Sequence, residues 1–256
     1  MNSTYWMGKE IIHKEITGST NLDIKELAMN GADEGTVVYA DMQTAGRGRR
    51  GRDWVSEKGD SLLFSLLLRP DIAPDKASQI TLLMALAVTK VLRERYGLES
   101  GIKWPNDIVI NSKKICGILT ELYPDLDGKF FIIVGCGINV AQKEIPNELQ
   151  NIATSLYLES GTVFSVEELL QGILKEFEEY YATFLQKESL EDLADKYNAQ
   201  LIGLNKEVRI LDPKGGFSGI SKGINDKGEL LVQLADGSIT EVYAGEVSVR
   251  GLYGYV

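Results

Sequence analysis

The 256-residue chain has only two cysteines and one histidine, which excludes several classes of site. Cys116 and Cys136 both lie in apolar segments, and this favours two buried, reduced thiols over a disulfide or a metal pair. A zinc cluster is not expected because so few ligands are available. His13 falls in a predicted strand over 10–17 and is expected to be structural, so histidine-based acid–base chemistry is not expected either.

Long hydrophobic runs and a secretory leader are also missing from the sequence. The longest apolar stretch, residues 82–88, is far shorter than the roughly 20 residues that cross a bilayer. The opening residues, MNSTYWMGKE, lack a basic segment followed by an apolar core. We therefore expect a cytoplasmic protein with no membrane partner.

Positive charge is scarce overall, since the formal net charge is −10. Proteins that bind DNA or RNA gain affinity by neutralising phosphates and usually have a basic domain. This chain repels polyanions on average, so no nucleic-acid partner is expected. A local basic loop on such an acidic body suits a small anion better than a polymer.

Hydrophobic patterning predicts an α+β catalytic domain over residues 1–203. We expect strands over 36–43, 61–70, 107–111, 114–123 and 130–140, and tight turns between the last three make the sheet mainly antiparallel. The apolar strand 61–70 is expected to be covered on both faces. Helices are predicted from Ser19–Asn21 to Gly31, over 75–97, over 165–187 with a capping box of Ser165 and Glu168, and from Ser189.

The character of the sequence changes near residue 203. Short strands are predicted over 206–211, 217–224, 229–234, 238–245 and 246–253, with turn signals at 226–228 and 236–237. Such spacing predicts a small β-barrel over residues 204–256.

One stretch concentrates positive charge: TAGRGRRGRDW, residues 44–54. It matches G-x-G-x-x-G, but no helix follows that would hold a pyrophosphate, so a dinucleotide fold is not expected. A Walker A motif is absent from the chain. Arginines offer bidentate donors to phosphate or carboxylate, glycines allow close backbone approach, and Trp54 offers a flat face for a purine. A disordered basic arm, a nucleic-acid contact and a loop around one charged ligand remain open on these residues alone.

Other polar groups interrupt the apolar strands. Lys103 and the pair Asn106–Asp107 flank a rigid Trp-Pro turn, although Asn106–Asp107 also suits an ordinary turn entering a strand. Lys114 opens an apolar strand, where it is either functional or an edge-strand lysine that limits aggregation. Asn139 ends the segment GCGIN, which is also typical of a bulge with a turn asparagine.

Five motifs together resemble biotin protein ligases, which join biotin to a lysine of carboxylase carrier domains. They are GSTN at 18–21, QTAGRGRRGRDW at 43–54, KWPNDI at 103–108, KKICGIL at 113–119 and GCGIN at 135–139. The resemblance covers the large domain. It implies a class II synthetase-like α+β domain, with a mixed, mainly antiparallel sheet flanked by helices, and an SH3-like C-terminal barrel.

The resemblance implies a reaction in two steps. Biotin attacks the α-phosphate of ATP, with Mg²⁺, to give biotinyl-5′-AMP and pyrophosphate. A lysine of the biotin carboxyl carrier protein of acetyl-CoA carboxylase or a related carboxylase then displaces AMP. The loop at 44–54 is expected to close over the reactive adenylate and keep water away from it.

The resemblance also assigns roles to individual residues. The implied catalytic residues are Lys114, Arg47, Arg49 and Asp107, with Asp107 either holding the metal or orienting and deprotonating the incoming lysine. The implied biotin contacts are Ser19, Thr20, Asn21, Gln43, Gly46, Arg47, Arg49, Lys114, Gly117 and Gly135. The implied ATP contacts are Arg49, Arg52, Trp54, Lys103, Asn106, Asp107 and Asn139.

Some members of this family carry an N-terminal DNA-binding domain that represses transcription. Ser19 lies almost at the start of this sequence, so no repressor role is expected. The alternatives are a lipoate or octanoate ligase or transferase of the related fold, an RNA-binding module, and a catalytically inactive sensor. A homodimer through the sheet of the large domain is left open.

Overall fold

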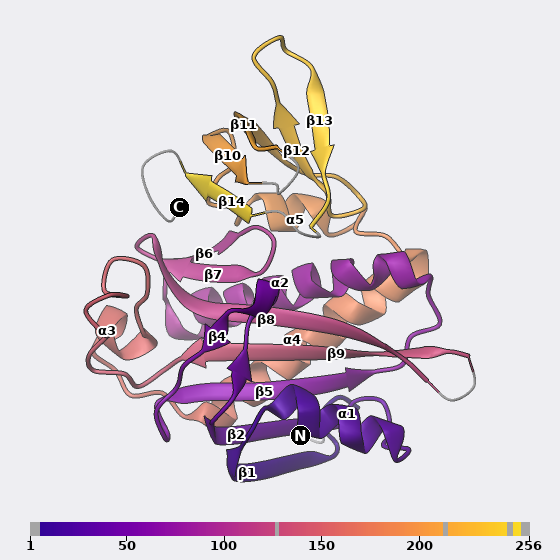
Figure 1. Ribbon diagram of the computed structural model, residues 1–256, viewed down its shortest axis with the longest axis vertical. Helices are drawn as coiled ribbons and strands as arrows, with labels where there is room; N and C mark the ends of the chain where they lie inside the picture. Colours follow the sequence, from indigo (N-terminus) through magenta and orange to yellow (C-terminus); the bar gives the residue numbers. More distant parts are fainter. Residues whose placement is uncertain (1–5, 126–127, 212–214, 245–247, 252–256) are drawn as a thin grey trace.

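The computed structural model describes residues 6–125, 128–211, 215–244 and 248–251. A seven-stranded sheet forms the centre of the molecule, with a smaller sheet at one end (Figure 1). The strand order is β1 (Ile11–Thr17), β2 (Val37–Gln43), β5 (Ser61–Leu68), β9 (Phe130–Asn139), β8 (Lys113–Pro124), β7 (Asp107–Ile110) and β6 (Ser100–Lys103). Only β1 and β2 pair in parallel within these ranges. The predicted mixed, mainly antiparallel sheet is therefore confirmed.

Helices cover both faces of this sheet. The helices α2 (Ala77–Tyr96) and α4 (Val166–Lys187) pack against each other on one face, and α1 (Thr20–Met29) packs across β2, β5 and β9 on the other. Alternate residues of β5 enter the two cores: Phe64 and Leu66 belong to the core shared with α2 and α4, and Leu67 belongs to the core beneath α1. This two-sided burial explains the continuous apolar run and confirms the prediction made for 61–70.

The ends of the long helices follow their predicted signals. Ser165 Oγ accepts a hydrogen bond from the backbone N–H of Glu168 at 3.2 Å, which is half of the predicted capping box. Gly97 ends α2 in a left-handed conformation with φ of 65°.

Several short elements differ from the prediction. The helix predicted from Ser189 begins instead at Ala194, as α5 (Ala194–Asn198), because Ser189 Oγ accepts from the N–H of Glu191 and caps a turn. The prediction also missed β6, α3 (Leu156–Ser160), and the hairpin of β3 (Gly46–Arg47) with β4 (Asp53–Trp54). Two short 3₁₀ helices, η1 (Arg49–Gly51) and η2 (Pro74–Lys76), complete the described elements.

The C-terminal sheet contains five antiparallel strands. They run in the order β13 (Ile239–Val242), β12 (Leu230–Gln233), β11 (Phe217–Ile224), β10 (Glu207–Leu211) and β14 (Ser248–Gly251). Among the described residues, the end strands β13 and β14 do not pair with each other. The predicted small β-barrel is thus a five-stranded antiparallel sheet that is not closed within these residues, since closure requires the two edge strands to meet. Residues 245–247, 252 and 253 of the predicted last strands lie outside the described ranges.

The small sheet lies against the β6–β7 end of the large sheet (Figure 1). Trp104 Nε1, in the turn between β6 and β7, donates to the carbonyl oxygen of Gly228 at 3.0 Å. Ile102 of β6 forms an isolated parallel β-bridge with Leu201, which precedes the small sheet in the chain. The domain boundary between residues 203 and 204 stays a prediction.

Of the helices in the described part of the chain, none combines the length and apolarity that a bilayer span requires.

Candidate active site

Two adjoining cavities lie where the arginine hairpin β3–β4 covers the large sheet. The first, the polar pocket, lies between the start of α1 and strands β8 and β9, and it contains Ser19, Thr20, Asn21, Gln43, Arg47, Lys114, Gly117 and Gly135. The second, the cationic cavity, reaches toward the small sheet and contains Arg50, Arg52, Lys103, Asp107, Lys114 and Arg250. Gly48, Arg49, Trp54, Asn106 and Lys114 line both cavities.

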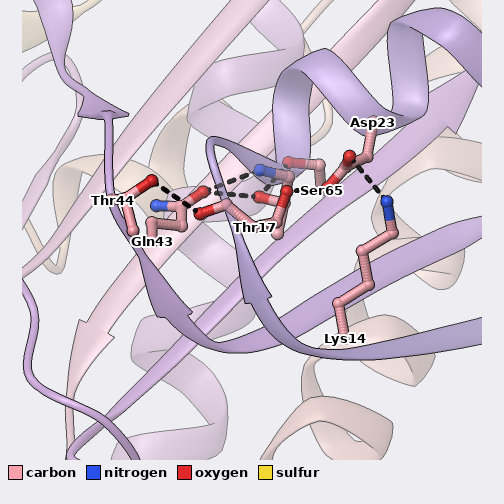
Figure 2. Close-up of polar contacts among 7 residues, drawn as sticks. Lys14, Thr17, Asp23, Gln43, Thr44 and Ser65 are labelled. Carbon is pink, nitrogen blue, oxygen red and sulfur yellow. Dashed lines mark hydrogen bonds and ion pairs between the residues drawn. The ribbon is translucent and has the colours of Figure 1, made fainter.

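A chain of hydrogen bonds forms one wall of the polar pocket. Gln43 Oε1 accepts from the backbone N–H of Thr20 at 2.8 Å and from its hydroxyl at 3.0 Å. Ser65 Oγ lies 2.7 Å from Thr20 Oγ1 and 2.5 Å from Asn21 Oδ1. Figure 2 shows Gln43 and Ser65 converging at the start of α1, beside the Lys14–Asp23 ion pair. These neutral groups are fixed before a ligand arrives, which suits recognition of an uncharged polar ring.

Glycines form the floor of the polar pocket. Gly117 of β8 pairs directly with Gly137 of β9, and the Trp54 indole rests on both residues. A Cβ atom at Gly137 would lie 2.7 Å from Trp54, and one at Gly135 would lie 2.1 Å from Asn21 Oδ1. Side chains at either position would displace these groups, so the sheet backbone must stay bare here.

The arginine segment forms an ordered hairpin. Gly46 pairs with Trp54 and Arg47 with Asp53, and the tip turns through Arg50 and Gly51, with φ of 61° and 69°. Gly46 lies in the first strand of the hairpin, where a Cβ atom would come 2.6 Å from the Trp54 carbonyl oxygen. A defined hairpin over a pocket rules out the disordered-arm interpretation.

Arg49 ties this hairpin to the turn between β6 and β7 and to a residue just after β13. Its guanidinium donates to Asn106 Oδ1 at 2.9 Å and also to the carbonyl oxygen of Ala244, next to the small sheet. Burial lowers the pKa of Arg49, and the nearby Asp107 carboxylate partly offsets that effect. Asn106 itself donates to the carbonyl oxygen of Ile118 at 3.1 Å, so its side chain connects the hairpin with β8.

Lys114 stands at the junction of the two cavities. Its Nζ atom lies 2.7 Å from Asp107 Oδ1 and 5.5 Å from the centroid of the Trp54 ring. The strand β8 pairs with β7 on one side and β9 on the other, so the edge-strand interpretation of Lys114 is wrong. The lysine instead points its charge into the space that both cavities share.

Lys103 is the most deeply buried cation of the cationic cavity. Its residue is 7% exposed, and burial lowers its pKa to about 7, with Asp107 opposing the shift. Arg250, Lys114 and Arg52 lower the pKa of Lys103 further by repulsion. This concentration of positive charge indicates a ligand with several negative charges.

A resident metal centre is not supported. In the described ranges, no three His, Cys, Asp or Glu side chains gather to hold an ion. Asp107 is the carboxylate beside Lys114, and one carboxylate suits a Mg²⁺ ion that arrives on nucleotide phosphates.

The structure brings most of the predicted site residues together, with two exceptions. Gly46 pairs with Trp54 inside the hairpin and does not line either cavity. Asn139 is likewise outside both linings: its Nδ2 donates to the carbonyl oxygen of Thr154 at 2.9 Å, and its Oδ1 faces Gln142. Cys116 and Cys136 are buried and free, with their sulfur atoms 3.5 Å apart.

Sequence reasoning missed four residues near the site: Ser65, Glu121, Gly137 and Arg250. Gly117 and Glu121 belong to the same strand and lie an even number of residues apart, so they share a face. That alternation could have found Glu121. Gly137 stands in the GCGIN motif and could have been found from its pairing with Gly117. Ser65 and Arg250 carry no local signal.

Comparisons with known proteins agree with this arrangement. The biotin/lipoate A/B protein ligase family matches residues 13–139, and the biotin protein ligase C-terminal domain matches residues 203–250. The chain is 40% identical over 245 residues to the bifunctional ligase/repressor BirA of Bacillus subtilis, covering 95% of this chain and 75% of that protein. It is 33% identical over 238 residues to a biotin–acetyl-CoA-carboxylase ligase of Mycobacterium tuberculosis, covering 90% and 85%. Biotin protein ligase from Aquifex aeolicus, in complex with biotin and ATP, superposes with a TM-score of 0.85 at 36% identity, covering 95% and 99%.

Proposed function

Because the chain belongs to the biotin protein ligase family, we propose that its two cavities activate biotin with ATP and pass it to a carrier-protein lysine. The observation that carries the proposal is the position of Lys114. It lies where the polar pocket, with its wall of neutral hydrogen-bonding groups, meets the strongly cationic cavity. That arrangement suits the joining of a carboxylate to a nucleotide phosphate.

The polar pocket is proposed to hold the acid. The ureido ring of biotin is uncharged and offers both donors and an acceptor, which match Ser19, Thr20 and Gln43. The acid's aliphatic chain would run over the bare glycine floor, and its carboxylate would reach Lys114 and Arg47. Biotin would thus be bound by fixed hydrogen bonds at one end and by charge at the other.

The cationic cavity is proposed to hold ATP. A carboxylate oxygen attacks the α-phosphorus, and pyrophosphate leaves with the bonding electron pair. Lys114 and Arg49 would neutralise the negative charge that builds on the reacting groups. Trp54 would present its flat face to the adenine, and Asn106 would stand beside it.

Asp107 is proposed to serve both halves of the reaction. With ATP bound, it would hold the Mg²⁺ that accompanies the nucleotide and offsets phosphate charge. After pyrophosphate has left, the same carboxylate would orient the lysine of the acceptor as that amine attacks the mixed anhydride. The lysine must lose a proton to attack, because an unperturbed ammonium is charged at neutral pH, and Asp107 would accept that proton. The amine then forms the amide bond as the acyl–phosphate bond breaks and AMP leaves.

The acceptor is proposed to be the biotin carboxyl carrier protein of an acetyl-CoA carboxylase or a related enzyme. This acceptor follows from the carboxylase ligase of Mycobacterium tuberculosis, which the chain resembles over 90% of its length. ATP and carboxylases meet in the cytoplasm, so we place the protein there. A homodimer formed through the large sheet stays a prediction.

The decisive experiment offers the protein three acids in parallel: biotin, lipoate and octanoate. Each is incubated with ATP and Mg²⁺, and mass spectrometry detects the acyl adenylate and pyrophosphate. A biotin carboxyl carrier domain is then added, and its mass is measured. We expect adenylate from biotin alone and a carrier heavier by one biotinyl group. Adenylate from lipoate or octanoate in place of biotin would overturn the proposal.

A further inference from the structure

A carboxylate just outside the polar pocket connects its hydrogen-bonded wall to the arginine hairpin. Glu121 Oε2 accepts from Asn21 Nδ2 at 2.7 Å. The other oxygen, Glu121 Oε1, lies 3.6 Å from Arg47 Nη2. A continuous polar path therefore runs from Gln43 at one end of the pocket to Arg47 at its mouth.

The backbone fixes the position of this carboxylate. Glu121 lies in β8, an interior strand of the sheet, and Leu119 of the same strand pairs with Gly135. Because Gly135 has no side chain, Asn21 can approach the sheet and reach Glu121. The Asn21 amide is itself held by Ser65, so the Glu121 side chain has a fixed partner on one side.

The partner on the other side is held far more loosely. The Arg47 side chain is 44% exposed, and at 3.6 Å its pair with Glu121 is long for a charge-assisted hydrogen bond. Exposed ion pairs of this kind contribute little, so a competing anion can replace one partner. The Tyr123 hydroxyl lies near both charges: burial and then Glu121 raise its pKa, while Arg47 lowers it.

We propose that Glu121 is a positioning residue, which keeps Arg47 at the mouth of the polar pocket and yields it to the carboxylate of the acid substrate. Without a ligand, Arg47 rests on Glu121. When an acid enters, Arg47 exchanges one carboxylate for another. This inference rests on the proposed function, since it takes the acid to be biotin.

The exchange has a consequence for selectivity. An acid must displace Glu121 to engage Arg47, whereas an uncharged analogue leaves the Arg47–Glu121 pair intact. Biotinol, the alcohol analogue of biotin, keeps the ring and the chain but has no carboxylate. The charge on Glu121 should therefore affect the affinity for biotin and leave the affinity for biotinol unchanged.

The test measures the dissociation constants of biotin and biotinol by calorimetry, in the absence of ATP. Glu121→Gln retains an oxygen that accepts from Asn21 but loses the charge that competes for Arg47. We expect biotin to bind about threefold to fivefold more tightly to this variant, because an exposed ion pair contributes little free energy. Biotinol should bind as it does to the parent protein. Glu121→Ala, which leaves Asn21 without its acceptor, should weaken the binding of both ligands.

Two further variants make the result specific. In an Arg47→Ala background, Glu121→Gln should no longer change biotin affinity, because the exchanged partner is gone. Glu15→Gln removes one negative charge from an exposed glutamate on β1 and should leave both affinities unchanged. Weaker biotin binding by Glu121→Gln, no change in it, or an improvement that persists without Arg47 would each overturn the exchange. Failure of the parent protein to bind either ligand would instead contradict the proposed function.

Discussion

The two cavities differ in how far they are assembled before a ligand arrives. In the polar pocket, Ser19, Thr20 and Asn21 are each at most 5% exposed, and Thr20 and Asn21 are held in the chain of hydrogen bonds. In the cationic cavity, Arg49, Arg52, Lys103 and Arg250 bring charge of one sign together, and a buried lysine has its pKa near 7. The hydrogen-bonding groups of the polar pocket are thus in place before a ligand binds, which suits a neutral ring. The positive side chains of the cationic cavity repel one another, and a bound anion would reduce that repulsion.

This difference has a physical cause in the elements that build each cavity. The hairpin covers both cavities, but strands of the large sheet and the first turn of α1 supply the hydrogen-bonding wall and the glycine floor of the polar pocket, so these groups cost little reorganisation on binding. The cationic cavity is made from a hairpin, a turn and one strand of the small sheet. The parts are held together by Arg49, which joins Asn106 to Ala244. We therefore expect changes at the junction to affect chemistry, and changes at the periphery to affect nucleotide affinity.

The largest effect is expected at Lys114, which both cavities share. Lys114→Ala removes the positive charge at the junction of the two cavities, and it leaves Asp107 without this partner. The rate of biotinyl-AMP formation should fall on the order of 10³-fold, the range seen for loss of one transition-state donor. Single-turnover measurement of adenylate by rapid quench would give this rate directly.

The neighbouring lysine provides the matched control. Lys113 lies on β8 beside Lys114 but faces a surface groove with Lys143 and Glu159. Lys113→Ala should retain the adenylation rate within about twofold, as for most exposed substitutions. Equal losses in the two variants would mean that the strand, and not the charge at the junction, is what matters.

The next effect concerns the glycine floor of the polar pocket. Gly137→Ala places a Cβ atom 2.7 Å from the Trp54 ring, so the indole must move away from its position over the glycines. Overpacking of this kind costs about 1–3 kcal/mol. We expect the KM for ATP to rise about tenfold or more, because Trp54 lines both cavities. Steady-state kinetics and tryptophan fluorescence would report the displacement.

Two further variants distinguish displacement of the Trp54 indole from a general loss of stability. Gly203→Ala adds the same methyl group where the nearest atom, on Val208, is 3.6 Å away, and it should leave the KM for ATP unchanged. In a Trp54→Ala background, Gly137→Ala should add almost nothing. A full additional loss in that background would show that the glycine acts independently of the indole.

A smaller, pH-dependent effect is expected from Lys103. Without nucleotide, Lys103 in the folded protein has a pKa of about 7, and bound phosphates would raise that pKa toward its ordinary value. The contribution of Lys103 to ATP affinity is then fully present below pH 7 and is lost as pH rises toward the bound-state pKa. Affinity should therefore fall by at most about tenfold per pH unit above pH 7. Calorimetry with a non-hydrolysable ATP analogue from pH 7 to 9 would measure this slope.

The same titration with Lys103→Met gives the background slope. Methionine fills the space of the lysine stem but carries no titrating group, so the steeper part of the curve should disappear. An unchanged slope in the variant would assign the pH dependence to the nucleotide or to another side chain.

The sequence predicted the parts of the fold that follow from long local patterns. Continuous or periodic apolar residues mark the buried strands β5 and β9 and the helices α2 and α4. The structure forms these elements where the patterns predict them. The edges of the small sheet could not be predicted because barrel closure depends on which strands meet, and no local pattern encodes that. The start of α5 was placed wrongly because Ser189 caps a turn with the same signal that begins a helix.

The site shows the same division between local and distant information. The motifs identified Lys114, Arg49 and the glycines because each motif is contiguous in the chain. Ser65 and Glu121 complete the wall of the polar pocket from 44 and 100 residues away from Asn21. Partners that the sheet brings together in this way leave no trace in a short window of sequence. Their hydrogen bonds nevertheless decide how the start of α1 is held.

The smallest effect is expected at the tip of the arginine hairpin. Arg50 lines the rim of the cationic cavity and has φ of 61°, a left-handed conformation that disfavours residues with a side chain. Arg50→Gly should stabilise the fold by a few tenths to about 1 kcal/mol in thermal unfolding, since glycine adopts this conformation without strain. The loss of one exposed charge should raise the KM for ATP by less than about fivefold. Arg49→Gly is the contrasting change, because Arg49 is held by Asn106 and Ala244. If Arg50→Gly weakened ATP binding as much as Arg49→Gly, the hairpin would act through its total charge, and the distinction between its anchored and exposed arginines would fail.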